Sequence, residues 1–105
     1  QALMGKAPMA VIVCSDSTRV MGCDQRASTV DCSIAMSFMM LAATAEGLGT
    51  CWIGGFTQEP LKEALGIPAE YDVVALTPLG YPAEEGRPRD RKPLEELVYK
   101  NGWKR

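Results

Sequence analysis

The sequence predicts an α+β domain in which a small sheet is layered against helices. Three observations support this fold class: two short apolar runs rich in β-branched residues, one long apolar segment of helical character, and Gly or Pro at the boundaries between them. The elements follow one another as strand, helix, helix and strand, with an extended tail after them. With 105 residues and no internal repeat, the chain forms a single domain over residues 1–105.

The first predicted element is a strand over residues 8–14, a continuous apolar run bounded by Pro8 and Ser15. Unbroken apolar runs are typical of strands buried on both faces, so we expect both faces of this strand to be covered. Residues 15–28 are polar, contain Gly22 and lack a clear period, which predicts a loop.

The longest predicted element is a helix over residues 29–46. Thr29 or Asp31 can cap its start, and Gly47 can end it in the left-handed conformation. Apolar side chains cover nearly its whole circumference, and a helix that is apolar all round must be buried all round. We therefore expect it to lie at a subunit interface as well as on the sheet. The alternative is a helix central to a larger monomer whose other half is absent. Small residues on one side would let another helix approach closely: Ser33, Ser37 and Thr44.

Two shorter elements follow. Residues 51–53 form a brief extended piece that ends at two glycines. Thr57 then caps a helix over residues 57–65, and Gly66 ends that helix in the left-handed conformation.

The last part of the chain contains a second strand and a tail. Residues 72–77 are mostly apolar and predict a strand, which we expect Pro78 and Gly80 to end. Residues 83–93 are rich in charge and proline and therefore extended, while residues 94–99 allow one or two turns of helix.

Composition excludes several classes of partner. The formal net charge of −2 gives no basic surface for nucleic acid or an anionic membrane. No unbroken apolar run reaches the roughly 18 residues that a membrane helix needs, and no signal peptide is recognisable, so we expect no membrane and a cytoplasmic location. Because the chain opens on Gln1 rather than methionine, we expect a processed, engineered or partial sequence.

The four cysteines and the absence of histidine restrict the chemistry. No Cys-x-x-Cys pair or His is present, so no metal site is expected and nucleophilic triads are excluded. Cys14 and Cys32 have apolar neighbours typical of inert core thiols. A thiol redox site using Cys23 and Cys51 is the least favoured function, because neither has the paired spacing or basic neighbours that lower a thiol pKa.

A glycine-rich segment is the first candidate binding site. Glycine allows a backbone to approach a flat ligand closely and to direct N–H groups at it. The spacing fits neither a P-loop nor a dinucleotide-binding fingerprint. The alternative is a helix C-cap followed by a tight turn. The segment reads Gly47-Leu48-Gly49-Thr50-Cys51-Trp52-Ile53-Gly54-Gly55-Phe56.

A basic segment in the tail is the second candidate. In an extended chain Arg87, Arg89 and Arg91 share one face, and guanidinium groups bind phosphate through paired hydrogen bonds. The alternative is a solvated, proline-stiffened tail.

The motifs together resemble the nitroreductase family. The resemblance runs over nearly the whole chain and follows the family's order through residues 31–35, 41–43, 46–56, 61–68, 73–82 and 89–98. It implies a dimeric or higher-oligomeric flavoprotein of nitroreductase-like α+β fold, with FMN bound in clefts at the subunit interface. FMN would take a hydride from NAD(P)H and pass electrons to a small-molecule acceptor such as a nitroaromatic or a quinone.

The resemblance also implies which residues bind the cofactor. Trp52, Ile53, Gly54 and Gly55 match the loop along the isoalloxazine ring, with the Gly54 N–H as the donor to flavin N5. Chemistry resides on the flavin, so no catalytic side chain is expected. The tail residues that match the phosphate-binding pair are Arg89 and Arg91, with Arg87 and Lys92 as weaker candidates.

One departure from the family matters. Family members carry an amino-terminal half with an Arg-rich, Ser-containing segment that binds the phosphate and ribityl chain, and this chain lacks it. The chain therefore corresponds to a partial domain. The alternative function is a catalytically inactive fragment of the same family that dimerises or binds a partner.

Overall fold

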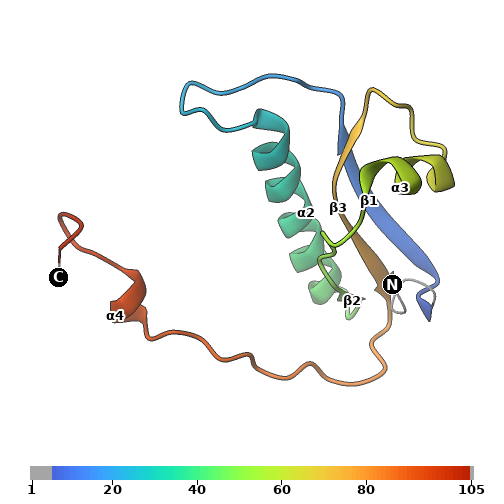
Figure 1. Ribbon diagram of the computed structural model, residues 1–105. Helices are drawn as coiled ribbons and strands as arrows, with labels where there is room; N and C mark the ends of the chain where they lie inside the picture. Colours follow the sequence, from blue (N-terminus) through green and yellow to red (C-terminus); the bar gives the residue numbers. More distant parts are fainter. Residues whose placement is uncertain (1–5, 105) are drawn as a thin grey trace.

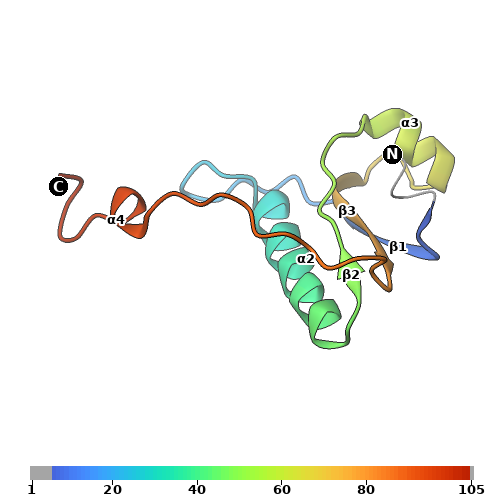
Figure 2. The same cartoon turned by 90° about the horizontal axis from the view of Figure 1, so that it is seen from below.

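The computed structural model describes residues 6–104 and has an α+β architecture, as the sequence predicts. A three-stranded antiparallel sheet with the order β1-β3-β2 forms the centre. Helix α2 lies along the sheet, α3 lies near the start of β3, and the C-terminal segment leaves the body of the molecule (Figures 1 and 2). The elements are β1 (Met9–Ser15), α2 (Ala27–Ala45), β2 (Gly49–Thr50), α3 (Gln58–Leu65), β3 (Asp72–Gly80) and α4 (Leu94–Leu97).

The central strand β3 carries most of the core. Val73, Ala75, Leu76 and Thr77 are all buried, and β1 pairs with β3 along its whole length, with one irregularity after Val13. The expectation that both faces of the first strand are covered is wrong for the described residues. Strand β1 lies at the edge of the sheet, where only β3 pairs with it, and it is therefore half-buried along most of its length.

Helix α2 begins at Ala27, two residues earlier than predicted. The expectation that Thr29 or Asp31 caps it is wrong: the N-cap is Arg26, which makes no side-chain capping bond. Instead, the Ala27 N–H donates to the Arg19 carbonyl at 3.1 Å, so the preceding loop satisfies this otherwise free donor.

The end of α2 agrees with the sequence prediction. The last helical residue is Ala45, and Gly47 adopts the left-handed conformation with φ +79°. A side chain at that position would strain the backbone, so glycine is the suitable residue.

The described residues bury only one side of α2. Met36 faces the sheet and is fully buried, whereas Ile34, Phe38 and Leu41 are 51%, 67% and 68% exposed. These three residues follow the i, i+4, i+7 spacing and form one apolar stripe on the outer face. By length and composition alone, α2 could span a membrane, because its mean hydropathy is 1.3. The sequence contains no unbroken apolar run that indicated this. Core helices of soluble proteins have the same length and composition.

Strand β3 is longer than predicted. It continues through Pro78, which pairs with Ala10 of β1, and ends at Gly80. The expectation that Pro78 ends the strand is therefore wrong. Helix α3 has its N-cap at Thr57 and its left-handed Gly66 at φ +69°, as predicted, although the Thr57 side chain makes no capping bond.

The segment after Gly80 extends away from the body, as predicted for residues 83–93 (Figure 1). The radius of gyration is 16.9 Å, whereas a compact chain of this length has about 13 Å. The short helix α4 lies on this arm, and its apolar residues are exposed: Leu94 by 71%, Leu97 by 58% and Val98 by 48%. Beyond it, the rings of Tyr99 and Trp103 stack with centroids 4.6 Å apart.

Candidate functional site

The glycine-rich loop lies between β2 and α3, and Ile53 pairs it with the central strand. The Ile53 N–H donates to the Leu76 carbonyl at 2.8 Å, and the Leu76 N–H donates to the Ile53 carbonyl at 3.2 Å. The Ile53 side chain is 7% exposed and belongs to the core. Ile53 therefore attaches the loop to the sheet, while its neighbours Trp52 and Gly54 remain exposed.

The residues on both sides of Ile53 present an open backbone. Trp52 is 39% exposed, and Gly54 and Gly55 are exposed. A Cβ atom added at Gly54 would meet no heavy atom within 4 Å, so nothing covers this backbone. An open, side-chain-free surface of this kind fits a flat ring system that stacks on the loop and accepts a backbone N–H.

The loop continues the register of the β2–β3 ladder. Strand β2 pairs Gly49 with Gly80 and Thr50 with Leu79, and the Ile53–Leu76 bridge keeps the same register after a gap. The ladder skips two positions, Cys51 opposite Pro78 and Trp52 opposite Thr77.

Pro78 explains why the ladder is interrupted there. Proline has no N–H and cannot donate across the sheet to the Cys51 carbonyl. The Cys51 N–H donates to the Thr77 hydroxyl oxygen at 2.8 Å, and that hydroxyl donates to the Pro78 carbonyl at 2.8 Å. The Thr77 hydroxyl thus lies between the Cys51 N–H and the Pro78 carbonyl, which would accept that N–H directly in a regular ladder.

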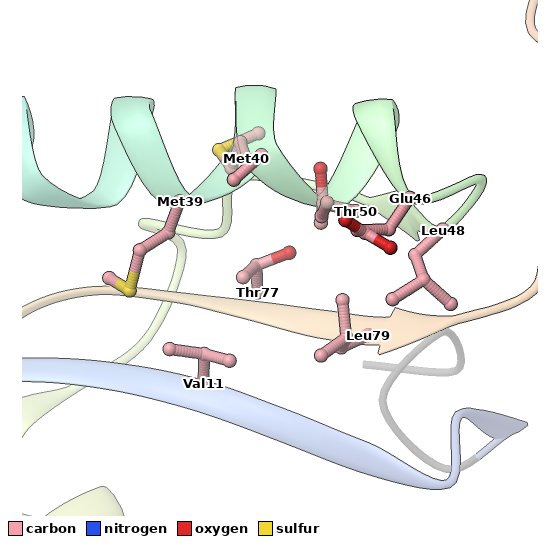
Figure 3. Close-up of a pocket in the computed structure, with 10 residues that line it drawn as sticks. Val11, Met39, Met40, Glu46, Leu48, Thr50, Thr77 and Leu79 are labelled. Carbon is pink, nitrogen blue, oxygen red and sulfur yellow. The ribbon is translucent and has the colours of Figure 1, made fainter.

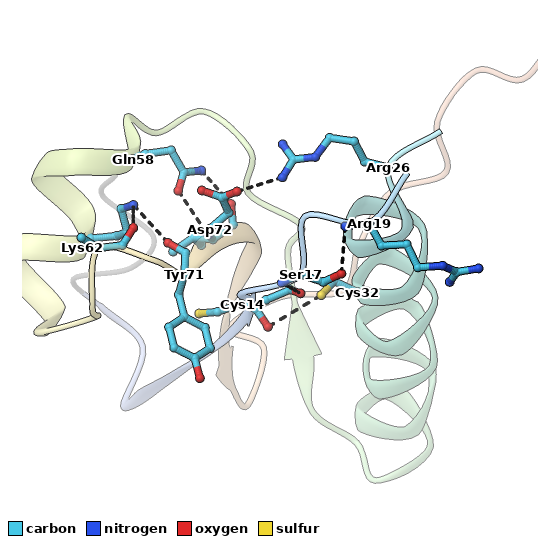
Figure 4. Close-up of polar contacts among 12 residues, drawn as sticks. Cys14, Ser17, Arg19, Arg26, Cys32, Gln58, Lys62, Tyr71 and Asp72 are labelled. Carbon is cyan, nitrogen blue, oxygen red and sulfur yellow. Dashed lines mark hydrogen bonds and ion pairs between the residues drawn. The ribbon is translucent and has the colours of Figure 1, made fainter. Parts of the chain in front are cut away.

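Helix α3 holds the other end of the loop through polar side chains (Figure 4). The Gln58 amide donates to the Val73 carbonyl at 2.7 Å and accepts from the Val73 N–H at 3.0 Å. One turn later, the buried Lys62 ammonium donates to the carbonyls of Ala69 and Tyr71 at 3.1 and 3.0 Å. These bonds attach α3 to the start of β3.

The two arginines predicted to bind phosphate lie elsewhere. Arg89 and Arg91 are exposed on the arm that leaves the sheet, away from the glycine-rich loop (Figures 1 and 2). Within this chain the structure therefore groups Trp52, Ile53 and the two glycines and leaves the arginines apart from them.

Comparison with known proteins identifies the family. A family model described as the Nitroreductase family matches residues 1–81, which is most of the chain. The chain belongs to the Nitroreductase family. A nitroreductase family protein from Clostridium difficile 630 has a similar structure, with a TM-score of 0.83 and 26% identity over 95% of this chain and 63% of that one. An FMN-dependent nitroreductase from Clostridium difficile R20291 matches with a TM-score of 0.74 and 26% identity, covering 92% of this chain and 59% of that one.

Sequence relatives give the same family. A putative NADH dehydrogenase/NAD(P)H nitroreductase of Methanothermobacter thermautotrophicus is 38% identical over 95 residues, 85% of this chain and 48% of the relative. An NADH dehydrogenase of Thermus thermophilus is 43% identical over 65 residues, 62% of this chain and 32% of the relative. The chain thus spans half or less of the length of these relatives, which agrees with the prediction of a partial nitroreductase domain.

An apolar groove separates α2 from the sheet in this nitroreductase chain (Figure 3). Its volume is about 280 Å³, and side chains of α2 face those of β1 and β3 across it. None of the predicted cofactor residues lines it. The residues that Figure 3 labels are Val11, Met39, Met40, Glu46, Leu48, Thr50, Thr77 and Leu79.

The four thiols are free and divide into two kinds. Cys23 and Cys51 are exposed, whereas Cys14 and Cys32 are half-buried. Burial raises the pKa of the Cys14 thiol, with Cys32 adding to the effect, and burial followed by the charge of Asp31 raises the pKa of Cys32. Both thiols therefore stay protonated at neutral pH, as expected of inert thiols, although neither belongs to the buried core. Among the described residues no cluster of His, Cys, Asp or Glu could hold a metal ion.

Sequence reasoning did not find the residues that fix the loop: Thr77, Gln58 and Lys62. The only local signal is the dipeptide Thr77-Pro78 inside an apolar strand, where a proline removes a ladder donor and a hydroxyl precedes it. The roles of Gln58 and Lys62 depend on contacts with β3 and the turn before it, which no local pattern reveals.

Proposed function

We propose that this chain is the carboxy-terminal half of the FMN-binding domain of a Nitroreductase-family oxidoreductase. The observation that carries the proposal is the open loop 52–55, which the buried Ile53 fixes to the sheet while Gly54 presents an uncovered backbone. Family membership and the relatives named NAD(P)H nitroreductase support the same assignment.

The residues on the loop fit FMN by their chemistry. The isoalloxazine ring is flat, and the backbone at Gly54 and Gly55 has no side chain to obstruct stacking. The Gly54 N–H is the proposed donor to the N5 position of the ring. Trp52, with 39% of its surface exposed, is available to contact the ring edge.

The arm supplies the proposed phosphate ligands. Arg89 and Arg91 lie one residue apart in an extended, exposed segment, so both side chains can point to the same side. Guanidinium groups bind phosphate oxygens through paired hydrogen bonds and retain their charge at all working pH values. Because the arm extends from the body, Arg89 and Arg91 would bind the phosphate of an FMN that lies either in the site of their own chain or in the site of a partner subunit.

When bound, FMN would supply the redox chemistry: it takes a hydride from NAD(P)H and passes electrons to a small acceptor such as a nitroaromatic or a quinone. The residues of this chain bind and orient the flavin and keep its ring face accessible. No side chain of the loop needs to donate or accept a proton, which agrees with the absence of histidine.

We further propose that the chain works as a homodimer or a higher oligomer. The outer stripe of α2, with Ile34, Phe38 and Leu41 more than half exposed, needs a cover that the described residues do not provide. The hydroxyls of Ser37 and Thr44 donate to carbonyls of their own helix at 2.8 and 3.1 Å. Their polar groups are therefore satisfied without water, and another helix can approach closely.

Anaerobic reduction tests the proposed activity. The protein is loaded with FMN, freed of excess flavin and mixed with NADH or NADPH while the visible flavin absorbance is followed. We expect bleaching by one of the two donors and recovery of the absorbance when a nitroaromatic or a quinone is added. Retained flavin that neither donor bleaches would contradict the proposed electron transfer. A colourless oligomer would instead favour the inactive binding fragment.

A further inference from the structure

The loop 51–58 is attached to β3 at two places by side chains that replace backbone pairing. At the first place, the Thr77 hydroxyl accepts the Cys51 N–H at 2.8 Å, in place of the Pro78 carbonyl that a regular ladder would use. Thr77 is 2% exposed, and its hydroxyl also donates to the Pro78 carbonyl, so both of its hydrogen-bonding roles are used inside the protein.

At the second place, a side-chain amide imitates a strand. The Gln58 amide both donates to and accepts from the backbone of Val73, as the peptide group of a neighbouring strand would. Val73 is 3% exposed, so water has little access to these bonds. Lys62, on the same face of α3, fixes the turn before β3 and keeps the helix in position.

We propose that Thr77 and Gln58 are positioning residues for the glycine-rich loop, holding residues 51–58 in one arrangement on β3 before any cofactor binds. Ordering a flexible loop costs conformational entropy, and a loop ordered in advance avoids that cost at the moment of binding. The expected gain in FMN affinity rests on the proposed function, whereas the order of the loop needs no cofactor to be measured.

A simpler arrangement is possible in which Ile53 alone holds the loop. Ile53 is buried and makes two backbone bonds with Leu76. Under that arrangement, removing the Thr77 hydroxyl would leave the loop unchanged. The two arrangements therefore predict different results when the Thr77 hydroxyl oxygen is removed: the loop loosens in one and is unchanged in the other.

The first experiment compares Thr77→Val, which keeps the shape and removes the hydroxyl, with Thr77→Ser, which keeps the hydroxyl. Thr18→Val is the matched control, because this threonine is exposed in the loop between β1 and α2. Amide hydrogen exchange at Cys51 and backbone ¹⁵N relaxation at Gly54 are measured in the flavin-free protein. We expect about ten-fold faster exchange at Cys51 in Thr77→Val only, which is ~1.4 kcal/mol and agrees with the cost of an unpaired buried donor.

Exchange at Ala75 separates a loosened loop from an unfolded protein. Ala75 lies in β3 opposite Val13 and is fully buried, so its exchange rises only when the sheet itself opens. A faster rate at Cys51 with an unchanged rate at Ala75 supports the proposal. Unchanged exchange and relaxation at Cys51 and Gly54 in Thr77→Val overturn it.

Gln58→Glu tests the second attachment and stands in if Thr77→Val does not fold. The carboxylate loses the donor to the Val73 carbonyl and brings two acceptors together, whereas Glu63→Gln on the exposed side of α3 is the control. We expect Gly54 and Gly55 to become more mobile in Gln58→Glu and not in Glu63→Gln. Equal mobility in the two variants overturns the assignment of Gln58.

Flavin binding is measured separately on the same proteins. We expect Thr77→Val and Gln58→Glu to weaken FMN retention about ten-fold, and Thr77→Ser to restore it. A looser loop with unchanged FMN affinity overturns the positioning role. If the parent protein retains no FMN, the proposed function fails, while the exchange data still decide whether the two residues order the loop.

Discussion

At the scale of single residues, the candidate site depends on one buried side chain between exposed neighbours. Ile53 is in the core, yet Trp52 and Gly54 beside it face solvent, because alternate residues of an extended chain point to opposite faces. In an extended arm the same alternation would bring Arg89 and Arg91 to one side. The proposed contacts with a ring and a phosphate therefore need only extended backbone and suitable residue types.

Replacing the two arginines tests their share of cofactor binding. We expect the double variant Arg89→Gln and Arg91→Gln to retain FMN about 10- to 100-fold more weakly, since each charge-assisted bond contributes roughly 1.5–3 kcal/mol and solvent screens part of it. The matched control is Lys100→Gln with Lys104→Gln, which removes two exposed charges from the same arm. Equal losses in the two double variants would show that only net charge matters.

The thiols provide a test of burial near β1 and α2. At about pH 8 we expect iodoacetamide to modify Cys23 and Cys51 first and Cys14 and Cys32 more slowly, as measured by mass spectrometry. Burial raises the pKa values of Cys14 and Cys32 above the ordinary value of a thiol in the folded state, so their contribution to stability is complete below that ordinary value. It is lost as the pH rises through the raised values. Uniform modification of all four thiols would contradict this burial.

At the scale of elements, the sequence indicated each helix and strand except β2, but not the contacts that set their ends. Gly47 and Gly66 were predictable as helix ends because only glycine adopts positive φ without strain. The start of α2 was missed because the Arg19 carbonyl, eight residues earlier, supplies the partner of the Ala27 N–H. Pro78 was expected to end β3, but the strand continues to Gly80 because it stays paired with β1, where Ala10 lies opposite Pro78.

The end of α3 gives a stability prediction. Gly66 has φ +69°, and a β-carbon there strains the backbone although the space around it is open. We expect Gly66→Ala to lower the free energy of unfolding by about 1–2 kcal/mol, measured by denaturant titration. Gly86→Ala is the control, because that glycine lies in the extended arm with open space around it and no positive φ. A smaller loss for Gly66 than for Gly86 would contradict the left-handed cap.

The outer stripe of α2 gives a prediction about assembly. Phe38→Lys places a charge at the centre of the stripe, and we expect the variant to be monomeric by light scattering under conditions where the parent is an oligomer. Leu65→Lys is the matched control, since Leu65 is 49% exposed at the end of α3 and away from the stripe. An oligomer that survives Phe38→Lys but not Leu65→Lys would place the interface elsewhere.

At the scale of the whole molecule, several apolar surfaces lack a cover among the described residues, which is the basis for the proposed oligomer. The apolar stripe of α2, the groove beside the sheet and the exposed α4 all belong to a chain that spans 48% of its Methanothermobacter relative. The all-round apolar pattern of α2 was the reason to expect an interface on this helix, and that expectation stays a prediction. It did not indicate where the arm would go, because an extended segment makes no contacts within its own chain that a pattern could predict.

Native mass spectrometry of the protein after incubation with FMN and removal of free flavin tests the central claim most directly. One spectrum reports both the number of chains and the number of bound flavins. We predict a species whose mass equals two chains, or a higher multiple, together with FMN. A protein that carries no FMN in any oligomeric state would contradict the assignment of the loop 52–55 and the arm as a cofactor site.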